Sequence, residues 1–309
     1  MIGIGESRLD PEYWKRVKSL TEKIVKLPKD SPQITRELLN TDCLLIGFGI
    51  PINKTHIDNA PQLKYIGTFS IAHGNVDIAY TKKKDILVCN LDGNTTKEAV
   101  AEFIFGAVLE HIRDLEKGKK QAREGNYSED GFSTTEIKNK VFGVFGLGRI
   151  GGVVAQIALA FGADVRYWSL HRKKDLETKG IKYQDADSLI PECDFISLNF
   201  ALNKDTENYL NQKRIAKIKG GAVVIATVPM ETIDINALEK RLKKKDITFI
   251  LDHSDEMSEE DLKTLSKFEN CIIYPPIAYV TKETRIGQQE SFIGNIENFL
   301  KGKPTNVIN

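Results

Sequence analysis

The sequence is poor in cysteine, and the few cysteines that it has are scattered. Cys43, Cys89, Cys193 and Cys271 lie far apart in a chain of 309 residues, with no C-x-x-C pair. Without such pairs or a Cys/His spacing, neither a disulfide framework nor a zinc site is expected. We therefore expect buried thiols in a reducing compartment and no metal site.

The chain also lacks a surplus of charge of either sign and long apolar runs. The chain has 44 Lys and Arg against 43 Asp and Glu, a formal charge of +1, whereas nucleic-acid binders carry a basic surplus. The longest apolar stretch, Ala99–Leu109, contains Glu102 and is too short to span a bilayer. Residues 1–10 lack the apolar segment of a secretory signal. We predict a cytoplasmic protein that binds neither nucleic acid nor membrane.

What the sequence does have is a regular alternation of short apolar runs with helix-length segments. Such alternation is typical of parallel sheets covered by helices on both faces. The expected strands are Cys43–Phe48, Tyr65–Ser70, Ile86–Asn90, Val141–Phe145, Asp164–Trp168, Phe195–Phe200, Ala222–Thr227, Ile247–Leu251 and Cys271–Tyr274. The expected helices include Pro11–Ile24, Gly151–Phe161, Asn211–Ile218 and Ile235–Lys244. The sequence therefore predicts an α/β protein.

Two places mark crossings between domains. Residues Thr95–Glu98 have the form of a capping box before a long helix, Ala99–Lys117. At the other end a double proline stops a strand, and an apolar stripe over Ile286–Leu300 predicts a terminal helix. At roughly 100–200 residues per domain, the length allows two domains. We expect one domain built from residues 1–97 and 281–309, with residues 98–280 inserted as the other.

The sharpest motif is Gly-Leu-Gly-Arg-Ile-Gly at residues 146–151. It follows the expected strand Val141–Phe145 and opens an amphipathic helix, which leads to the expected strand Asp164–Trp168. This is the β-α-β setting in which the G-x-G-x-x-G pattern binds a dinucleotide. A purely structural strand–helix turn is the alternative.

Each glycine of the motif has a distinct expected role. Gly146 permits the tight turn, Gly148 lets the backbone approach a pyrophosphate, and Gly151 lets helix and strand pack closely. Arg149 and Ile150 begin the helix, whose unpaired amides and positive end favour phosphate. We predict that all five residues contact a dinucleotide.

The second strand of this unit ends without a carboxylate. An NAD site usually has Asp or Glu about 20 residues beyond the motif, on the ribose 2′-hydroxyl. Here Trp168 is followed by Ser169 and then by His171, Arg172 and two lysines. Ser169 and Arg172 are suited to a 2′-phosphate, which arginine binds bidentately. We favour NADP over NAD, with a solvated lysine-rich loop as the alternative.

These features resemble the D-isomer-specific 2-hydroxyacid dehydrogenases, in particular the glyoxylate and hydroxypyruvate reductases. The resemblance covers nearly the whole chain, through Leu63–Gly67, Asn75–Asp77, Ala99–Phe103, Phe145–Gly151, Ala160–Gly162, Cys193–Leu198 and Leu251–Asp252. It implies a Rossmann-type cofactor domain inserted into a flavodoxin-like substrate domain built from both termini. It also implies a cleft between the domains and a homodimer formed through the cofactor domain.

The family's reaction is reversible hydride transfer between nicotinamide and C2 of a 2-oxo or 2-hydroxy acid, and it uses a His, an Arg and a Glu. The resemblance puts Pro276 at the histidine position and Pro229 at the arginine position. Proline has no ionisable group, so neither residue can supply the lost function. Around the glutamate position the chain reads Asp252-His253-Ser254-Asp255-Glu256-Met257, without the usual proline.

Other side chains are therefore candidates for the chemistry. His253 follows an expected strand, at the sheet edge where α/β proteins place ligands, and Asp255 or Glu256 is suited to orient it. Tyr279 is an alternative phenolic proton donor. For the substrate, the resemblance implies the loop Ile71-Ala72-His73. For the cofactor, it adds Phe200, Ala201, Thr206, Val228 and Asp252. A purely structural role is the alternative for each.

Three interpretations remain open. The first is an NAD(P)-dependent oxidoreductase with a changed acid/base set, acting on a 2-oxo or 2-hydroxy acid or a related carbonyl compound. The second is a catalytically silent dinucleotide-binding protein that acts as a sensor or partner-binding module. The third is a weak reductase of reactive aldehydes or ketones that uses solvent protons. The cofactor-binding residues persist, which indicates that the dinucleotide still matters but does not choose between turnover and sensing. We predict the first, with the second as the alternative.

Overall fold

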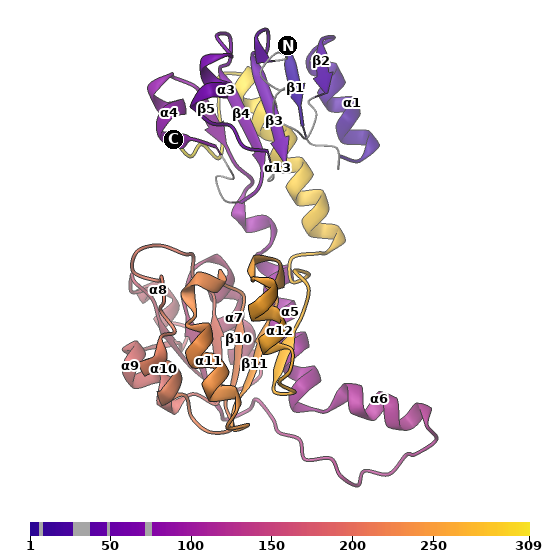
Figure 1. The fold of residues 1–309 in the computed structure, drawn as a ribbon, viewed down its shortest axis with the longest axis vertical. Helices are drawn as coiled ribbons and strands as arrows, with labels where there is room; N and C mark the ends of the chain where they lie inside the picture. Colours follow the sequence, from indigo (N-terminus) through magenta and orange to yellow (C-terminus); the bar gives the residue numbers. More distant parts are fainter. Residues whose placement is uncertain (6–8, 27–37, 48–49, 72–75) are drawn as a thin grey trace. The chain divides into compact units, whose positions relative to one another are not determined.

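The computed structural model describes residues 1–5, 9–26, 38–47, 50–71 and 76–309. It contains two compact units, one formed by Met1–Thr95 with Thr281–Asn309 and the other by Thr96–Val280 (Figure 1). We call them unit 1 and unit 2. The assignment of residues 98–280 to a cofactor domain, and of residues 1–97 and 281–309 to a substrate domain, stays a prediction.

Unit 1 is built on a parallel sheet with the strand order β2-β1-β3-β4-β5. Its strands are β1 (Ile2–Ile4), β2 (Ile24–Lys26), β3 (Cys43–Gly47), β4 (Tyr65–Phe69) and β5 (Leu87–Cys89). Its helices include α1 (Pro11–Leu20), α3 (Lys54–Asp58), α4 (Ile78–Lys83) and α13 (Lys282–Leu300). This strand order is that of flavodoxin, so the flavodoxin-like expectation for the terminal domain is confirmed.

The predicted helix Pro11–Ile24 was too long. The helix α1 ends at Leu20, because Thr21 adopts an extended conformation (φ −163°, ψ 146°). Ile24 then begins β2, whose β-branched residues pair in parallel with β1. Each of these two strands has only three residues, and neither lies in an apolar run from which a strand was predicted.

The terminal helix α13 closes the core of unit 1, as its apolar stripe predicts. Phe292, Ile293 and Ile296 are completely buried, and the ring of Phe292 lies 5.1 Å from that of Phe69 on β4 in an edge-on contact. Aromatic contacts of this geometry add to the free energy gained by burial. The two ends of the stripe, Ile286 and Leu300, remain exposed.

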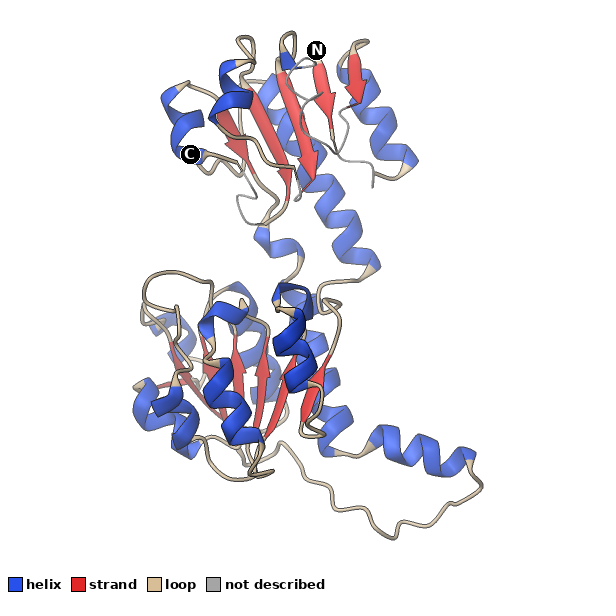
Figure 2. Ribbon diagram, viewed as in Figure 1, coloured by secondary structure: helices blue, strands red, loops and turns tan. Residues whose placement is uncertain are grey.

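Unit 2 is a three-layer α/β/α unit around a parallel sheet of order β12-β11-β10-β9-β6-β7-β8 (Figure 2). The strands are β6 (Val141–Phe145), β7 (Asp164–Trp168), β8 (Lys182–Tyr183), β9 (Phe195–Leu198), β10 (Val223–Ala226), β11 (Thr248–Leu251) and β12 (Cys271–Ile273). One face packs on α5 (Lys97–Ile112) and α7 (Arg149–Ala160). The other packs on α9 (Ala186–Leu189), α10 (Gln212–Lys217), α11 (Ile235–Leu242) and α12 (Glu259–Leu265). The predicted Rossmann-type arrangement is confirmed.

The start and end of the long helix differ from the prediction. No side-chain capping bond forms at the N-cap, Thr96; the hydroxyl of Thr95 instead donates to the carbonyl of Asp92, at 2.8 Å. The helix α5 ends at Ile112 because Asp114 takes a left-handed conformation (φ 50°), and a separate helix, α6 (Leu115–Arg123), follows. The capping box is therefore not formed.

The remaining expectations about composition concern cysteines and apolar helices. All four cysteines are buried free thiols, and burial raises the pKa of Cys193 to about 12, which makes it a poor nucleophile. No helix in the described part of the chain combines the length and the apolarity needed to cross a bilayer.

Candidate cofactor and active site

The carboxyl ends of all the strands of unit 2 meet at one edge of its parallel sheet. The strands β6 and β9 are neighbours there, and the chain runs outward from them in opposite directions. Ligands of such sheets bind outside this topological switch point. Eight residues singled out in the sequence lie in the first few positions after these strands: Gly146, Ser169, Phe200, Val228, Pro229, Asp252, His253 and Pro276.

The glycine-rich loop has the geometry that its first and third glycines were expected to allow. Gly146 has φ +92°, a conformation that side chains strongly disfavour, and a Cβ there would lie 2.8 Å from the carbonyl oxygen of Asn199. A Cβ on Gly151 would lie only 2.0 Å from the carbonyl oxygen of Gly146. Both residues must therefore be glycine for the loop to close, whatever it binds.

Gly148 is different, because nothing within the protein requires a glycine there. It is the N-cap of α7, its backbone is extended (φ −86°, ψ −151°), and it makes no side-chain cap. A Cβ at this position would meet no protein atom within 4 Å. Gly148 and Arg149 are exposed and Ile150 is half-buried. The open space beside the first amides of α7 fits a pyrophosphate, which needs close approach to the backbone.

The loop after β7 contains a carboxylate that the sequence analysis did not consider. Glu177, on α8 (Lys174–Glu177), accepts hydrogen bonds from Arg172 Nε and Nη2 at 2.7 and 2.8 Å. These bonds, followed by one from Tyr167, lower the pKa of Glu177 to about 2. Ser169 is half-buried and His171 exposed. The sequence could have indicated Glu177 only by its position, as a carboxylate that closely follows Arg172 beyond the strand.

The loop after β9 has a buried anchor and an exposed surface. Thr206 is completely buried; its hydroxyl donates to the carbonyl of Ala201 at 2.7 Å and accepts from the amide of Asn203 at 2.8 Å. Its hydroxyl thus closes the loop. Phe200 is half-buried, with its ring 4.8 Å from that of Tyr209, and Ala201 is exposed. Phe200 and Ala201 are the predicted residues of this loop that are accessible to a cofactor.

A buried carboxylate follows β11. Asp252 is 3% exposed, and its Oδ2 accepts a hydrogen bond from the amide of Ala278 at 3.0 Å. Its Oδ1 has no hydrogen-bond partner, and burial raises the pKa of this carboxyl. An unpaired buried acceptor is costly unless a ligand satisfies it. Val228, after β10, is completely buried, so its side chain packs in the core of unit 2.

His253 lies between two carboxylates at the same edge. Its Nδ1 is 3.4 Å from Glu256 Oε1 and its Nε2 is 3.7 Å from Asp252 Oδ1. Burial lowers the pKa of His253, but the Glu256 bond and the charges of Asp252, Glu256 and Asp255 outweigh it and raise the pKa above its ordinary 6.5. The His253 bond, in turn, lowers the pKa of Glu256, whose carboxylate also accepts from the amide of Met230. The arrangement favours the protonated form of the imidazole next to Asp252.

The other predicted site residues have no comparable setting. Pro229 and Pro276 are half-buried, and Tyr279 is 41% exposed. Asp255 is exposed on the short turn Ser254–Glu256.

Of the predicted substrate loop, only Ile71 is described. It is half-buried, and its carbonyl accepts from the amide group of Asn90 within unit 1. Ala72 and His73 lie outside the described residues.

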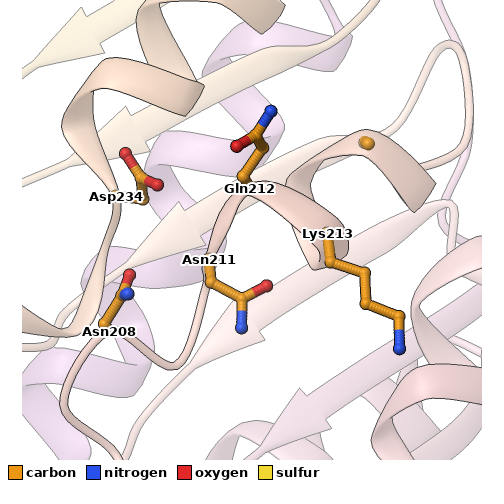
Figure 3. Close-up of a pocket in the computed structure, with 6 residues that line it drawn as sticks. Asn208, Asn211, Gln212, Lys213 and Asp234 are labelled. Carbon is orange, nitrogen blue, oxygen red and sulfur yellow. The ribbon is translucent and has the colours of Figure 1, made fainter.

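A hollow of about 560 Å³ lies on unit 2 between the starts of α10 and α11 (Figure 3). None of the residues that line it is a predicted site residue; they are Asn208, Asn211, Gln212, Lys213, Ala216 and Asp234. The side chains of Asn211 and Asp234 accept hydrogen bonds from amides of their own helices. The hollow is therefore lined by ordinary helix caps.

Comparisons with known proteins agree with this geometry. Residues 105–278 match the model of the D-isomer-specific 2-hydroxyacid dehydrogenase NAD-binding domain. The glyoxylate reductase of Thermofilum pendens is 32% identical over 95% of this chain and 90% of its own. The D-lactate dehydrogenase of Aquifex aeolicus, solved with NAD and lactic acid, is 27% identical with a TM-score of 0.84, covering 98% of this chain and 96% of its own.

A third similar protein is an acyclic imino acid reductase, Bsp5, solved with NADPH and D-Arg. It is 28% identical, with a TM-score of 0.86 and complete coverage of both chains. The family model spans more than half of the present chain, and the relatives span nearly all of it. The chain therefore belongs to the D-isomer-specific 2-hydroxyacid dehydrogenase family and is an NAD(P)-dependent oxidoreductase.

Proposed function

We propose that the protein reduces a small 2-oxo acid to the 2-hydroxy acid, reversibly, with His253 as the proton donor. The observation that carries this proposal is the position of His253 between Asp252 and Glu256 at the carboxyl edge of the sheet. A bound NAD(P)H supplies the hydride. Glyoxylate and lactate, named for its relatives, define the substrate class.

Each residue of the edge has a definite task in this scheme. The amides at the start of α7, next to Gly148, bind the pyrophosphate. Asp252 Oδ1, which has no hydrogen-bond partner, would accept a hydrogen bond from the nicotinamide carboxamide. Glu256 holds His253 through Nδ1, so that Nε2 carries the proton given to the substrate oxygen. Asp255 and Tyr279 are alternatives for positioning or donating this proton, and both are exposed.

This scheme includes the proposal that Pro229 and Pro276 replace the family's arginine and histidine. Proline cannot carry a proton or a charge, so a residue from another part of the edge must protonate the substrate. The anchor for the substrate carboxylate is then the backbone of the loop Ile71-Ala72-His73, with the side chain of His73 as an additional candidate.

The direct test is turnover with both reduced cofactors. Oxidation of NADPH and NADH is followed by absorbance with glyoxylate, hydroxypyruvate and a panel of aldehydes. We expect measurable reduction of 2-oxo acids. A tight cofactor complex without turnover of any substrate would contradict the proposal and support the silent dinucleotide-binding alternative, which the comparisons do not favour.

A second substrate class deserves the same assay, because 2-imino acids need no proton donor. An iminium group already carries its proton, so hydride transfer to its carbon leaves no alkoxide to be protonated. A proline at the histidine position is compatible with that chemistry. A similar solved protein acts on imino acids. Dependence of the rate on His253 separates the two classes: carbonyl reduction requires it, and iminium reduction does not.

The preferred cofactor is proposed to be NADP, bound at the loop after β7. Arg172 supplies the charge for a 2′-phosphate and Ser169 a hydroxyl. Replacing Arg172 with Ala is expected to weaken NADPH binding about tenfold, because a charge-assisted bond to the phosphate is lost, and to leave NADH binding nearly unchanged. Fluorescence titration with both cofactors measures this. Equal affinities in the parent protein that Arg172→Ala does not alter would contradict the NADP preference.

We also propose that unit 2 carries the contact of a homodimer, formed by α6 and the loop that follows it. Helix α6 has no buried residue, and Figure 1 shows it extending with its loop from the body of unit 2. Tyr127 in the loop is 85% exposed and Leu115 is 47% exposed. Exposed apolar side chains on such an arm suit a covered interface. Light scattering is expected to give the mass of a dimer, and the mass of a monomer at high protein concentration would contradict this.

A further inference from the structure

Glu177 is held in place more firmly than a surface ion pair requires. Besides its two bonds from Arg172, its Oε1 accepts a hydrogen bond from the Tyr167 hydroxyl at 2.8 Å. Tyr167 is completely buried on β7, and its oxygen also accepts from the amide of Lys173 at 2.8 Å. The carboxylate is thus fixed by the core of the sheet, and it fixes Arg172 in turn.

We infer that Glu177 weakens the binding of NADP relative to NAD at this loop by occupying the edge of Arg172 that a 2′-phosphate would bind. The inference rests on the proposed binding of the cofactor's ribose at the loop after β7. A carboxylate pairing with Nε and Nη2 uses the bidentate geometry that phosphate also uses. NADPH must therefore displace Glu177 or accept only the remaining edge of the guanidinium, whereas NADH faces no such competition.

Charge acts in the same direction as this competition. Glu177 neutralises Arg172 and places a negative charge next to a site for a phosphate, which like-charge repulsion opposes. Arg172 would keep its place without Glu177, because its guanidinium also stacks on the ring of Tyr183, 5.1 Å from the ring centre. Removing the charge of Glu177 therefore frees a preoriented arginine for the phosphate.

The test compares Glu177→Gln with Asp175→Asn in the full-length protein. Asp175 is an exposed carboxylate on the same short helix, so its variant changes the net charge equally without touching Arg172. The dissociation constants of NADPH and NADH are measured by fluorescence at low and high ionic strength. For Glu177→Gln we expect NADPH to bind about fivefold more tightly, as for an exposed charge pair, and NADH within about twofold. The gain should shrink in high salt and vanish when Arg172→Ala is added.

The outcomes separate this inference from the proposed NADP preference. An unchanged ratio of the two dissociation constants in Glu177→Gln, or an equal shift in Asp175→Asn, would overturn the inference. A parent protein that prefers NADH, combined with a shift toward NADPH in Glu177→Gln, would support the inference and contradict the NADP preference. Thermal melting confirms that each variant is folded. A folded parent protein and folded variants that bind neither cofactor would overturn both proposals.

Discussion

Replacing His253 with Asn is expected to lower kcat/KM for glyoxylate reduction by about 10²- to 10⁴-fold, the usual contribution of a positioned general acid. The cofactor should still bind, because the proposed pyrophosphate site at the glycine-rich loop is separate from the contacts of the imidazole with Asp252 and Glu256. Steady-state kinetics and cofactor titration on the same preparations measure the two effects separately. His111→Asn, in the last turn of α5 in the same unit, is the matched control.

The dependence of the rate on pH gives an independent check of this role. Reduction needs the protonated imidazole, so its rate should fall as pH rises through the His253 pKa, which lies above the ordinary 6.5. Oxidation of the hydroxy acid needs the neutral form and should rise over the same range. Glu256→Gln removes a group that raises this pKa and should move both limbs to lower pH. A pH profile that is the same in His253→Asn would contradict the assignment.

The expected effect of His253→Asn is smaller for a 2-imino acid substrate than for a 2-oxo acid. If the protein reduces 2-imino acids, His253→Asn should change that rate by less than about tenfold, because no proton is transferred to the substrate in the hydride step. Comparing glyoxylate alone with glyoxylate and an excess of amine therefore tests both candidate functions on one variant. A large loss on both would indicate that His253 also holds the substrate in place.

Replacing Gly148 with Val is expected to weaken binding of either dinucleotide by about 10- to 100-fold while leaving the melting temperature within a few degrees. The loss corresponds to one or two charge-assisted bonds between backbone amides and the pyrophosphate. The fold should tolerate the change, because the backbone of Gly148 is extended and no protein atom lies within 4 Å of the added Cβ. Fluorescence titration and thermal melting measure the two quantities.

Substitutions of two further glycines serve as controls for the Gly148 variant. Gly106→Val, at an exposed position of α5 where a Cβ also meets no atom within 4 Å, should leave binding unchanged. Gly151→Ala should lose both binding and stability, because its Cβ would lie 2.0 Å from a backbone oxygen. Unimpaired dinucleotide binding by Gly148→Val would mean that the pyrophosphate does not approach the start of α7.

The sequence was most informative where a property depends on neighbouring residues. The strands β6 and β7 were predicted with their bounds, because the apolar run of β6, the alternation along β7 and the glycines between them are local signals. The stripe of α13 is local in the same sense. The strands β1, β2 and β8 were missed because they are short and lie outside the apolar runs used to predict strands, whereas the equally short β5 and β12 lie within such runs. The bond that Thr95 makes to Asp92 replaced the predicted capping box.

Some features of the candidate site were likewise readable from the sequence, and others were not. From the sequence came the glycine loop, the proximity of His253 and Glu256, and the absence of a carboxylate at the end of β7. Only the three-dimensional structure showed that Glu177 on α8 accepts two hydrogen bonds from the guanidinium of Arg172. It also decided that the buried Asp252 accepts a hydrogen bond from Ala278, far along the chain, and that its other oxygen has no hydrogen-bond partner. The contact between Asp252 and Ala278 depends on which strands end side by side, and parallel pairing of β11 with β12 sets that for residues distant in sequence. Arg172 and Glu177 are near in sequence, and the turn between β7 and α8, held by the buried Tyr167 hydroxyl, brings them together.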